Sequence, residues 1–576
     1  MHVTTDPEKA HLLEPDHPDG ESQRSQPDNI PTRATSPARS KLWILFAVLV
    51  LSKSALVLSL LAHRSWTSKA SVELGDVCVQ PVPASPSNWT DLYRHEGFAL
   101  QSAKRLSGAV RIPTQSFDDM DEPGKDDRWQ PFDDLKSYLR GTFPAVHQTA
   151  TLDLIRSHSM VYTIDGTNKA LKPLMLTGHL DVVPATTSLD RWTHPPFAGV
   201  IEGEWVYGRG TSDCKNNVIG ILTALEYMLK NGWRPSRAIV AAFGMDEEVG
   251  GERGAAAISD FLEAKYGKEG IAMIVDEGGM GIETMYGTQF ALPGMAEKGY
   301  GNFIIEVDMA GGHSSIPSKH TSIGILSKII SEIEDRDLFQ PDIRQSSPMW
   351  GYMQCVAVHG DKTVPSWIKN AVQTKLPRLS KVGREFANVS PANRYLIQTS
   401  KAATVITGGN KVNALPESAI VTINSRIDSY SNVEEVSKAY LSIMKEIGKT
   451  YGLSVNGASL TGATSSLGDI ALTVNQPGPP SPITPTDSAA FEVFSKSVQA
   501  TFGKDVVTAP SSMTGNTDTR HYVNLTPHIY RWSPTKIGTR LNAHTVDEKI
   551  KIETHVDAIR FYTELIVQAD GAGSAL

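Results

Sequence analysis

Long apolar runs alternate with a strongly helical pattern between residues 172 and 279. The runs "KPLMLTG", "RAIVAAFG" and "IAMIVDEGG" are apolar almost to their ends, whereas "NVIGILTALEYMLKNG" places Val218, Leu222, Leu225 and Leu229 at helical spacing. Strands that are apolar on both faces are typical of sheets covered by helices on both sides. The sequence therefore predicts an α/β fold with a parallel or mixed sheet buried between helices.

Each of these strands ends in side chains that can bind a metal. His179 and Asp181 follow the first strand. Glu247 and Glu248 follow the second, and Asp276 ends the third. The carboxyl ends of parallel strands meet at one edge of a sheet, where ligands usually bind. Carboxylates gathered there repel one another and are costly to desolvate, and divalent cations reverse both effects, so we expect a metal site.

Two distant motifs add further ligands. Asp213 lies in "VYGRGTSDCKNN", just before the predicted helix, and His544 lies in "RLNAHTVDE" near the C-terminus. Imidazole and carboxylate groups without a thiolate pair favour Zn²⁺ or a related first-row ion. In a two-metal hydrolytic site one carboxylate stays free to act as a general base, and the neighbours Glu247 and Glu248 can divide ligation and base catalysis between them. The chain has no H-E-x-x-H, G-x-S-x-G, P-loop or paired CxxC motif for a competing chemistry.

Several of these stretches together resemble the M20 metallopeptidases, and within them the fungal carboxypeptidase S-like, vacuolar, membrane-anchored branch. The resemblance covers most of residues 95 to 570 in the family's order, through "TGHLDVVP", "YGRGTSDCKNN", "GMDEEVGG", "VDEGG", "GGHSSIP", "NKVNALPESA" and "RLNAHTVDE". It implies an α/β catalytic domain with a mixed sheet, interrupted by a smaller α+β lid that also serves for dimerisation in many members. We expect the catalytic domain at residues 96–298 and 475–570 and the lid at 299–474.

The resemblance implies a ligand set for two zinc ions. His179 and Asp276 would bind one ion, Glu248 and His544 the other, and Asp213 would bridge both. In the family the peptide bond that follows the bridging residue is often cis.

The resemblance also implies roles for residues around the metals. Asp181 resembles the carboxylate that orients His179 through its other ring nitrogen, and Glu247 resembles the base. His313 resembles the histidine that stabilises the tetrahedral oxyanion, in some relatives from the partner subunit. Asn413 and Arg426 match lid residues that hold the substrate, with the guanidinium gripping the free carboxylate. The loop "MTGNTDTRHY" resembles a stretch that lines the same pocket.

Three cysteines, Cys78, Cys214 and Cys355, are too few and too scattered for a disulfide framework or a zinc finger. They leave the redox compartment open. Cys214 follows Asp213 at a position where many relatives carry another Asp, and we infer no thiol chemistry from it.

The N-terminus predicts a membrane anchor. Residues 42–62, "LWILFAVLVLSKSALVLSLLA", are long enough to cross the hydrocarbon as one helix, although they carry Lys53. A polar tail, residues 1–41, precedes them, which favours a signal anchor over a cleaved signal peptide. A buried core helix is the alternative interpretation. Residues 63–95 contain a Pro/Ser-rich stretch and are predicted as a stalk.

Targeting signals point to a lumenal enzyme. Basic residues slightly favour a cytosolic tail, and Glu8 followed by Leu12 and Leu13 resembles an acidic dileucine signal for a vacuole or lysosome. We expect a single-pass type II membrane protein of the vacuole with a lumenal active domain. The N-glycosylation sequons beyond the span are at Asn88, Asn388 and Asn524.

The composition limits the functional classes. The chain has 576 residues, of which 40% are apolar, and a net charge of −8 without a basic stripe, which predicts a multidomain globular protein and argues against nucleic acid as the partner. We predict a di-zinc carboxypeptidase that hydrolyses the C-terminal peptide bond of short peptides. A homodimer formed through the lid is a further expectation. The alternatives are an amidohydrolase of N-acyl amino acids and a membrane receptor or scaffold on an inactive peptidase fold. The role of residues 335–400 stays open.

Overall fold

The computed structural model describes residues 74–279, 281–459 and 467–576 of the chain. All of them belong to one compact unit, Ala70–Leu576. The predicted tail and membrane span at 1–62 lie outside the described residues. Within the described ranges, no helix is both long and apolar enough to cross a membrane.

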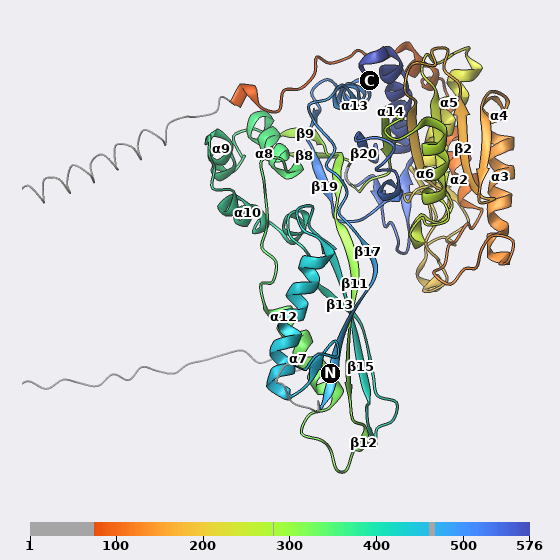
Figure 1. Cartoon of the computed structure of the whole chain (residues 1–576). Helices are drawn as coiled ribbons and strands as arrows, with labels where there is room; N and C mark the ends of the chain where they lie inside the picture. The colour runs from red at the N-terminus through yellow and green to blue at the C-terminus, as the bar shows by residue number, and fades with distance from the viewer. Residues whose placement is uncertain (1–73, 280, 460–466) are drawn as a thin grey trace, which may run out of the picture. The chain divides into compact units, whose positions relative to one another are not determined.

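An eight-stranded mixed sheet forms the centre of the part predicted as the catalytic domain (Figure 1). The three apolar runs form β3 (Leu174–His179), β6 (Ile239–Gly244) and β7 (Met273–Asp276), which are buried at every position. β3 lies between β6 and β7 and is parallel to both. The predicted α/β fold with a mixed sheet is therefore confirmed. The sheet order is β1 (Thr151–Ile155), β2 (Ser159–Ile164), β6, β3, β7, β20 (Ile529–Arg531), β10 (Gly294–Glu297) and β19 (Ser511–Met513).

Helices cover both faces of this sheet because successive strand side chains point to opposite sides. Leu174 and Leu176 of β3 pack in one core with the predicted helix α5 (Lys215–Lys230). Met175, between them, packs in another core with α6 (Ala255–Tyr266). The other helices of the first core are α2 (Phe98–Val110), α3 (Gln130–Thr142), α4 (Pro144–Thr149), α13 (Ala489–Phe502) and α14 (Ile552–Gly571).

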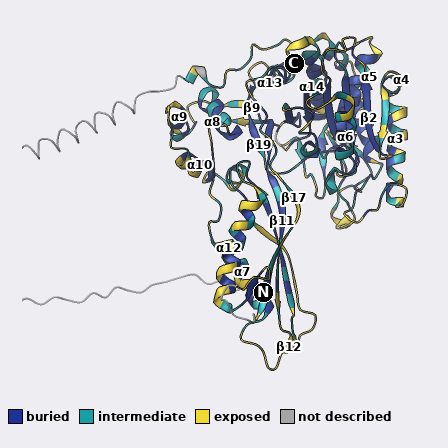
Figure 2. Ribbon diagram, viewed as in Figure 1, coloured by how far each residue is buried: buried dark blue, intermediate teal, exposed yellow. Residues whose placement is uncertain are grey.

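A five-stranded sheet of the predicted α+β type forms the part predicted as the lid. Its strand β11 (Gly299–Met309) starts directly after β10 and buries alternate residues, because only one face of the sheet is covered by helices. These helices are α7 (Ser322–Asp335) and α12 (Val433–Tyr451), and both carry exposed residues on their outer sides (Figure 2). The sheet order is β13 (Ala402–Gly408), β15 (Ser418–Ile427), β11, β17 (Gly468–Gly478) and β16 (Ser454–Val455).

Residues 335–400 form a helical layer outside the lid sheet. Four helices share an apolar core with Phe290 of β9 (Thr288–Ala291) and with Val507 of β18 (Val507–Thr508). These strands and β8 (Ile282–Met285) make a three-stranded sheet. The segment thus packs against strands from the residues predicted as the catalytic domain, although it lies in the range predicted as the lid. Its helices are α8 (Pro348–His359), α9 (Ser366–Gln373), α10 (Leu379–Ala387) and α11 (Pro391–Leu396).

A disulfide ties the predicted stalk to this helical layer. Cys78 is bonded to Cys355 of α8, 277 residues away in sequence. The Gln80 amide exchanges two hydrogen bonds with the backbone of Thr508, at 2.8 and 3.1 Å. From Cys78 onward, the described part of the stalk is therefore attached to the fold rather than free.

Smaller elements complete the described chain. Two small sheets are a four-stranded sheet and a two-stranded ribbon, and the ribbon follows the end of β11 in sequence. The four-stranded sheet has the order β21 (Arg540–Leu541), β22 (Lys549–Lys551), β5 (Trp205–Tyr207) and β4 (Val200–Glu202), and the ribbon pairs β12 (Gly312–His313) with β14 (Ala414–Leu415).

Candidate metal centre

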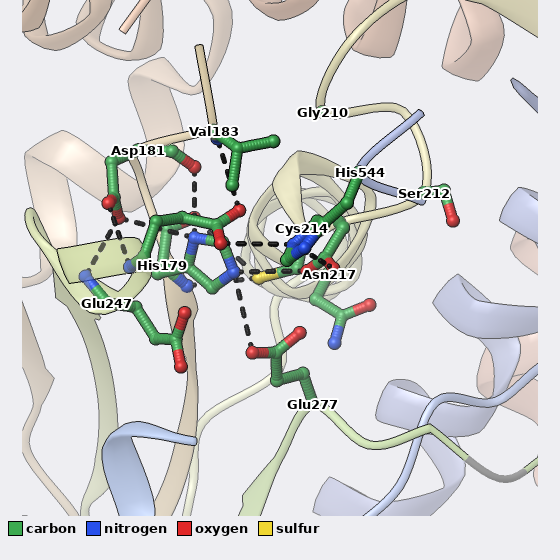
Figure 3. A network of polar contacts seen from close by, with 12 residues as sticks. His179, Asp181, Val183, Gly210, Ser212, Cys214, Asn217, Glu247, Glu277 and His544 are labelled. Atoms are coloured by element: carbon green, nitrogen blue, oxygen red, sulfur yellow. Dashed lines mark hydrogen bonds and ion pairs between the residues drawn. The ribbon is translucent and has the colours of Figure 1, made fainter. Parts of the chain in front are cut away.

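Asp181 contacts residues at the ends of both β3 and β6. Its backbone oxygen lies 2.9 Å and its Oδ1 3.3 Å from His179 Nδ1, which leaves Nε2 of that ring free to face the site. The backbone N–H groups of Glu247 and Glu248 each donate to the Asp181 carboxylate at 3.1 Å (Figure 3). Ser116 Oγ donates to the same carboxylate at 2.6 Å. One buried carboxylate thus fixes the histidine and both glutamates relative to one another.

The first group of potential ligands surrounds His179 Nε2. Asp213 Oδ1 lies 3.2 Å and Glu277 Oε1 3.4 Å from this nitrogen. The thiol of Cys214 belongs to the same group, but it accepts a hydrogen bond from the His179 backbone N–H at 3.1 Å, and burial holds its pKa well above the usual range. The sulfur is therefore already engaged by the backbone of the neighbouring strand β3. The Asp213–Cys214 peptide bond is cis, as the resemblance implied.

The structure brings Glu277 into this group in place of Asp276. Asp276 is still part of β7, and its side chain shares the strand face of Ile274, which packs in the core with α6. Its Oδ1 accepts from the Glu277 N–H at 2.7 Å, and its Oδ2 has no hydrogen-bond partner among the described residues. Glu277 follows the strand end and turns toward His179. This corrects the assignment of Asp276 as a ligand.

The second group consists of Asp213, Glu248 and His544. His544 Nε2 lies 3.1 Å from Asp213 Oδ2 and 3.0 Å from Glu248 Oε2. Asp213 thus presents one oxygen to each histidine, which is the arrangement expected of a bridging ligand. The His544 side chain is 53% exposed, so this side of the site opens to solvent.

Glu548 fixes the loop that carries Asp213. Its Oε1 accepts from the backbone N–H groups of Gly210, Ser212 and Asp213 at 2.8 to 3.1 Å, and its Oε2 pairs with Arg209 at 2.6 Å. Glu548 and the Arg209 side chain are buried. Sequence reasoning missed this residue, although it stands only four positions after His544.

The acidic groups of the site are crowded and buried. Burial raises the pKa of Glu247 well above its usual range, that of Glu248 to about 7 and that of Asp276 to about 8. Hydrogen bonds with Asp213 and Glu248 raise the pKa of His544 to about 10. Divalent cations would replace this proton sharing, since they offset both repulsion and desolvation. The nitrogen and oxygen donors, in two groups that share one carboxylate, fit a pair of first-row divalent ions.

Glu247 differs from Glu248 in having an uncommitted carboxylate. Both begin the short 3₁₀ helix η5 (Glu247–Val249). Glu248 accepts from the Val183 N–H at 3.3 Å and contacts His544, whereas no described residue donates a hydrogen bond to the side chain of Glu247. Figure 3 shows that this carboxylate lies beside the His179 ring. The pair thus divides into one ligand candidate and one free base.

The lid residues predicted from the resemblance separate into two places. Arg426 lies at the base of the lid, where its Nη1 donates to Asn516 Oδ1 at 2.9 Å. His313 and Asn413 lie near the opposite end of β15, where Ser314 N donates to the Asn413 backbone oxygen at 3.1 Å. The stretch from Ser418 to Arg426 alone spans roughly 27 Å in an extended strand. Within one chain, the structure therefore does not bring His313 or Asn413 to the ligand groups, because the long β11–β15 pair carries them away.

The predicted glycosylation sites are all accessible. Each asparagine is exposed, and Asn524 also donates to Glu263 Oε2 at 3.4 Å. Their modification stays a prediction. The three positions are Asn88, Asn388 and Asn524.

Comparison with known proteins assigns the family. The model of peptidase family M20/M25/M40 matches residues 175–568. The chain belongs to this family. This M20 chain is 36% identical to carboxypeptidase S of Saccharomyces cerevisiae over 86% of its length and 89% of the relative's. It is 31% identical to an N-fatty-acyl-amino acid synthase/hydrolase of Mus musculus, over 84% of its length and 90% of the relative's.

Solved structures agree on the fold. The crystal structure of human carnosine dipeptidase 1 superposes with a TM-score of 0.58 at 13% identity, covering 85% of the M20 chain and 100% of the dipeptidase. The resemblance read from the motifs and the expectation of an M20 metallopeptidase are confirmed.

Proposed function

We propose that this M20 enzyme is a dinuclear zinc carboxypeptidase that hydrolyses the last peptide bond of short peptides. The observation that carries the proposal is the position of Asp213 between two histidines, with Glu277 beside one and Glu248 beside the other. His179, Asp213 and Glu277 would hold one ion, and Asp213, Glu248 and His544 the second. When bound, such a pair polarises the amide carbonyl and lowers the pKa of the attacking water.

The residues of the chain supply the remaining steps. Glu247 takes the proton from the attacking water and delivers it to the leaving amine, because no described residue donates a hydrogen bond to its carboxylate, whereas Glu248 is engaged by Val183 and His544. Asp181 keeps His179 and the glutamate backbones in register during this transfer. His313, which lies with Asn413 at the far end of β15, would have to reach the oxyanion from a second copy of the chain.

A matched pair of variants tests the corrected ligand. Glu277→Gln is expected to weaken binding of one ion by about 10- to 100-fold, because an amide oxygen carries no charge to offset that of the cation. Asp276→Asn is expected to keep both ions, since its carboxylate faces the α6 side. Metal content after dialysis against graded chelator distinguishes the two. Loss of an ion in Asp276→Asn with retention in Glu277→Gln would restore the original assignment.

The free carboxylate of the substrate is expected at Arg426. The guanidinium groups of Arg426 and Arg520 lie 5.9 and 5.4 Å from the centre of the Tyr300 ring, so two cations gather at the base of the lid. Arg426→Ala is expected to raise KM by about 10- to 100-fold with a smaller change in kcat, because a charge-assisted pair is lost. Steady-state kinetics on one blocked dipeptide measures both, with exposed Arg384→Ala on α10 as the control. An unchanged KM would remove this role.

Hydrolysis of N-acyl amino acids is the second candidate function. The relative from Mus musculus supports it, and such a substrate presents the same amide beside a free carboxylate. Purified full-length protein assayed with N-blocked dipeptides and with N-fatty-acyl amino acids separates the two functions. Efficient turnover of the acyl amino acids alone would overturn the peptidase proposal. If metal analysis of the purified, folded protein found no bound zinc under the assay conditions, the receptor or scaffold alternative would be favoured.

Dimerisation and location are proposed on separate grounds. β13, at an edge of the lid sheet, is exposed along its whole length, and an uncovered edge strand can pair with a second chain. The Cys78–Cys355 disulfide favours an oxidising compartment, in keeping with a lumenal domain of a vacuolar membrane protein.

A further inference from the structure

A cavity of about 420 Å³ opens directly beside the proposed metal ligands. Glu248 forms part of its wall, and Val183, also in the wall, donates its backbone N–H to that carboxylate at 3.3 Å. Ser116 lines the cavity as well and donates its hydroxyl to Asp181 at 2.6 Å. A group bound here is therefore in contact with the residues that hold the reaction centre in place.

Apolar and acidic residues complete the wall of the cavity. Phe117, Pro184 and Val249 are apolar, as is the side chain of Val183, whereas Asp118 and Asp119 are acidic. A few polar groups among apolar walls are typical of small-molecule sites. The cavity thus matches a substrate portion that carries no polar head of its own.

The charges around the cavity exclude an acidic occupant. Asp119 is paired with Arg128 at 2.7 Å, and the guanidinium of Arg128 also binds Asp126 and covers the Phe117 ring at 5.2 Å. Asp118 is exposed and has no ion pair within the described ranges. None of the described lining residues is a cation. A carboxylate placed here would be repelled, in contrast to the arginine pair beside Tyr300.

We infer that this cavity receives the apolar acyl group of the substrate, on the N-terminal side of the scissile bond, and sets the preference for it. The inference rests on the proposed function, because it names the substrate portion that lies opposite the carboxylate held at Arg426. In a blocked dipeptide, the occupant is the apolar side chain of the residue before the scissile bond. In an N-acyl amino acid, it is the hydrocarbon chain of the acyl group. Both would contact the same apolar side chains of the cavity.

Filling the cavity tests the inference. Val183→Trp in the full-length protein is expected to lower kcat/KM by about 10- to 100-fold for blocked dipeptides with Leu or Phe before the scissile bond, since each lost apolar contact group reduces transition-state binding. The Gly substrate is expected to change less than about threefold, since it has no side chain to place. Metal content is expected to stay unchanged. Leu154→Trp, at an exposed position of β1, is the matched control and is expected to keep the wild-type preference.

Two further variants make the result independent of that substitution. Phe117→Ala enlarges the cavity and is expected to shift preference toward longer N-acyl chains when acetyl and octanoyl amino acids are compared. Asp118→Lys is expected to raise kcat/KM about tenfold for a Glu before the scissile bond. Equal Leu-to-Gly ratios in wild type, Val183→Trp and Phe117→Ala would overturn the inference while leaving the peptidase function intact. Failure of the wild type to hydrolyse either substrate class would overturn the function itself.

Discussion

Replacing Glu247 by Ala is expected to lower turnover of a blocked dipeptide by about 10²-fold or more while both metals stay bound. The reason is that Glu247 presents a carboxylate to which no described residue donates a hydrogen bond, whereas its neighbour Glu248 contacts His544. Removal of a base slows proton transfer without removing a ligand. Steady-state kinetics together with metal analysis of the same sample checks both parts.

The conservative change Glu247→Gln keeps the size of the side chain but removes its ability to accept a proton. It is expected to be as slow as the alanine variant, because an amide cannot take the proton. Asp260→Ala, at an exposed acidic position of α6, is the control for loss of one negative charge and is expected to retain full activity. Wild-type turnover in Glu247→Gln would show that this carboxylate is not the base.

Replacing Asp213 by Ala is expected to abolish activity together with metal binding. Asp213 is the one side chain common to both ligand groups, with its two oxygens 3.2 and 3.1 Å from His179 and His544. Its loss therefore removes a ligand from each ion and leaves the remaining acids to repel one another. Metal content measured after gel filtration is expected to fall for both ions.

Comparison of the two variants tests the division of labour. Asp213→Ala and Glu247→Ala are both expected to lose activity, but only Asp213→Ala is expected to lose metal. Equal metal content in both would contradict the assignment of Asp213 as the shared ligand. Circular dichroism of each variant checks that the fold is retained.

The sequence predicted those parts of the fold that depend on local periodicity. The apolar runs that end at His179, before Glu247 and at Asp276 are strands, and the pattern from Val218 to Leu229 is a helix. A strand that is buried on both faces consists of a continuous apolar run, so it can be predicted from its composition. The candidate ligands follow these runs, and the carboxyl ends of parallel strands meet at one edge of the sheet.

What the sequence could not predict depends on single turns and on distant partners. Between Asp276 and Glu277, the choice of ligand is decided by where β7 ends, and two adjacent carboxylates look alike in a motif. Glu548 acts on a loop more than 300 positions away. The motif presents Asn413 and Arg426 as one substrate-binding group, but the length of β15 separates them in the structure.

The disulfide between Cys78 and Cys355 shows that the folded part of the chain includes residues before the predicted boundary at residue 96. Tyr93, only 3% exposed, packs in the main core, and its hydroxyl lies 2.5 Å from Thr563 Oγ1 of α14. A chain trimmed to the predicted boundary at residue 96 would lose this ring and leave the Cys355 thiol unpaired. Recombinant versions should therefore begin upstream of Cys78, so that the helical layer keeps its covalent fastening.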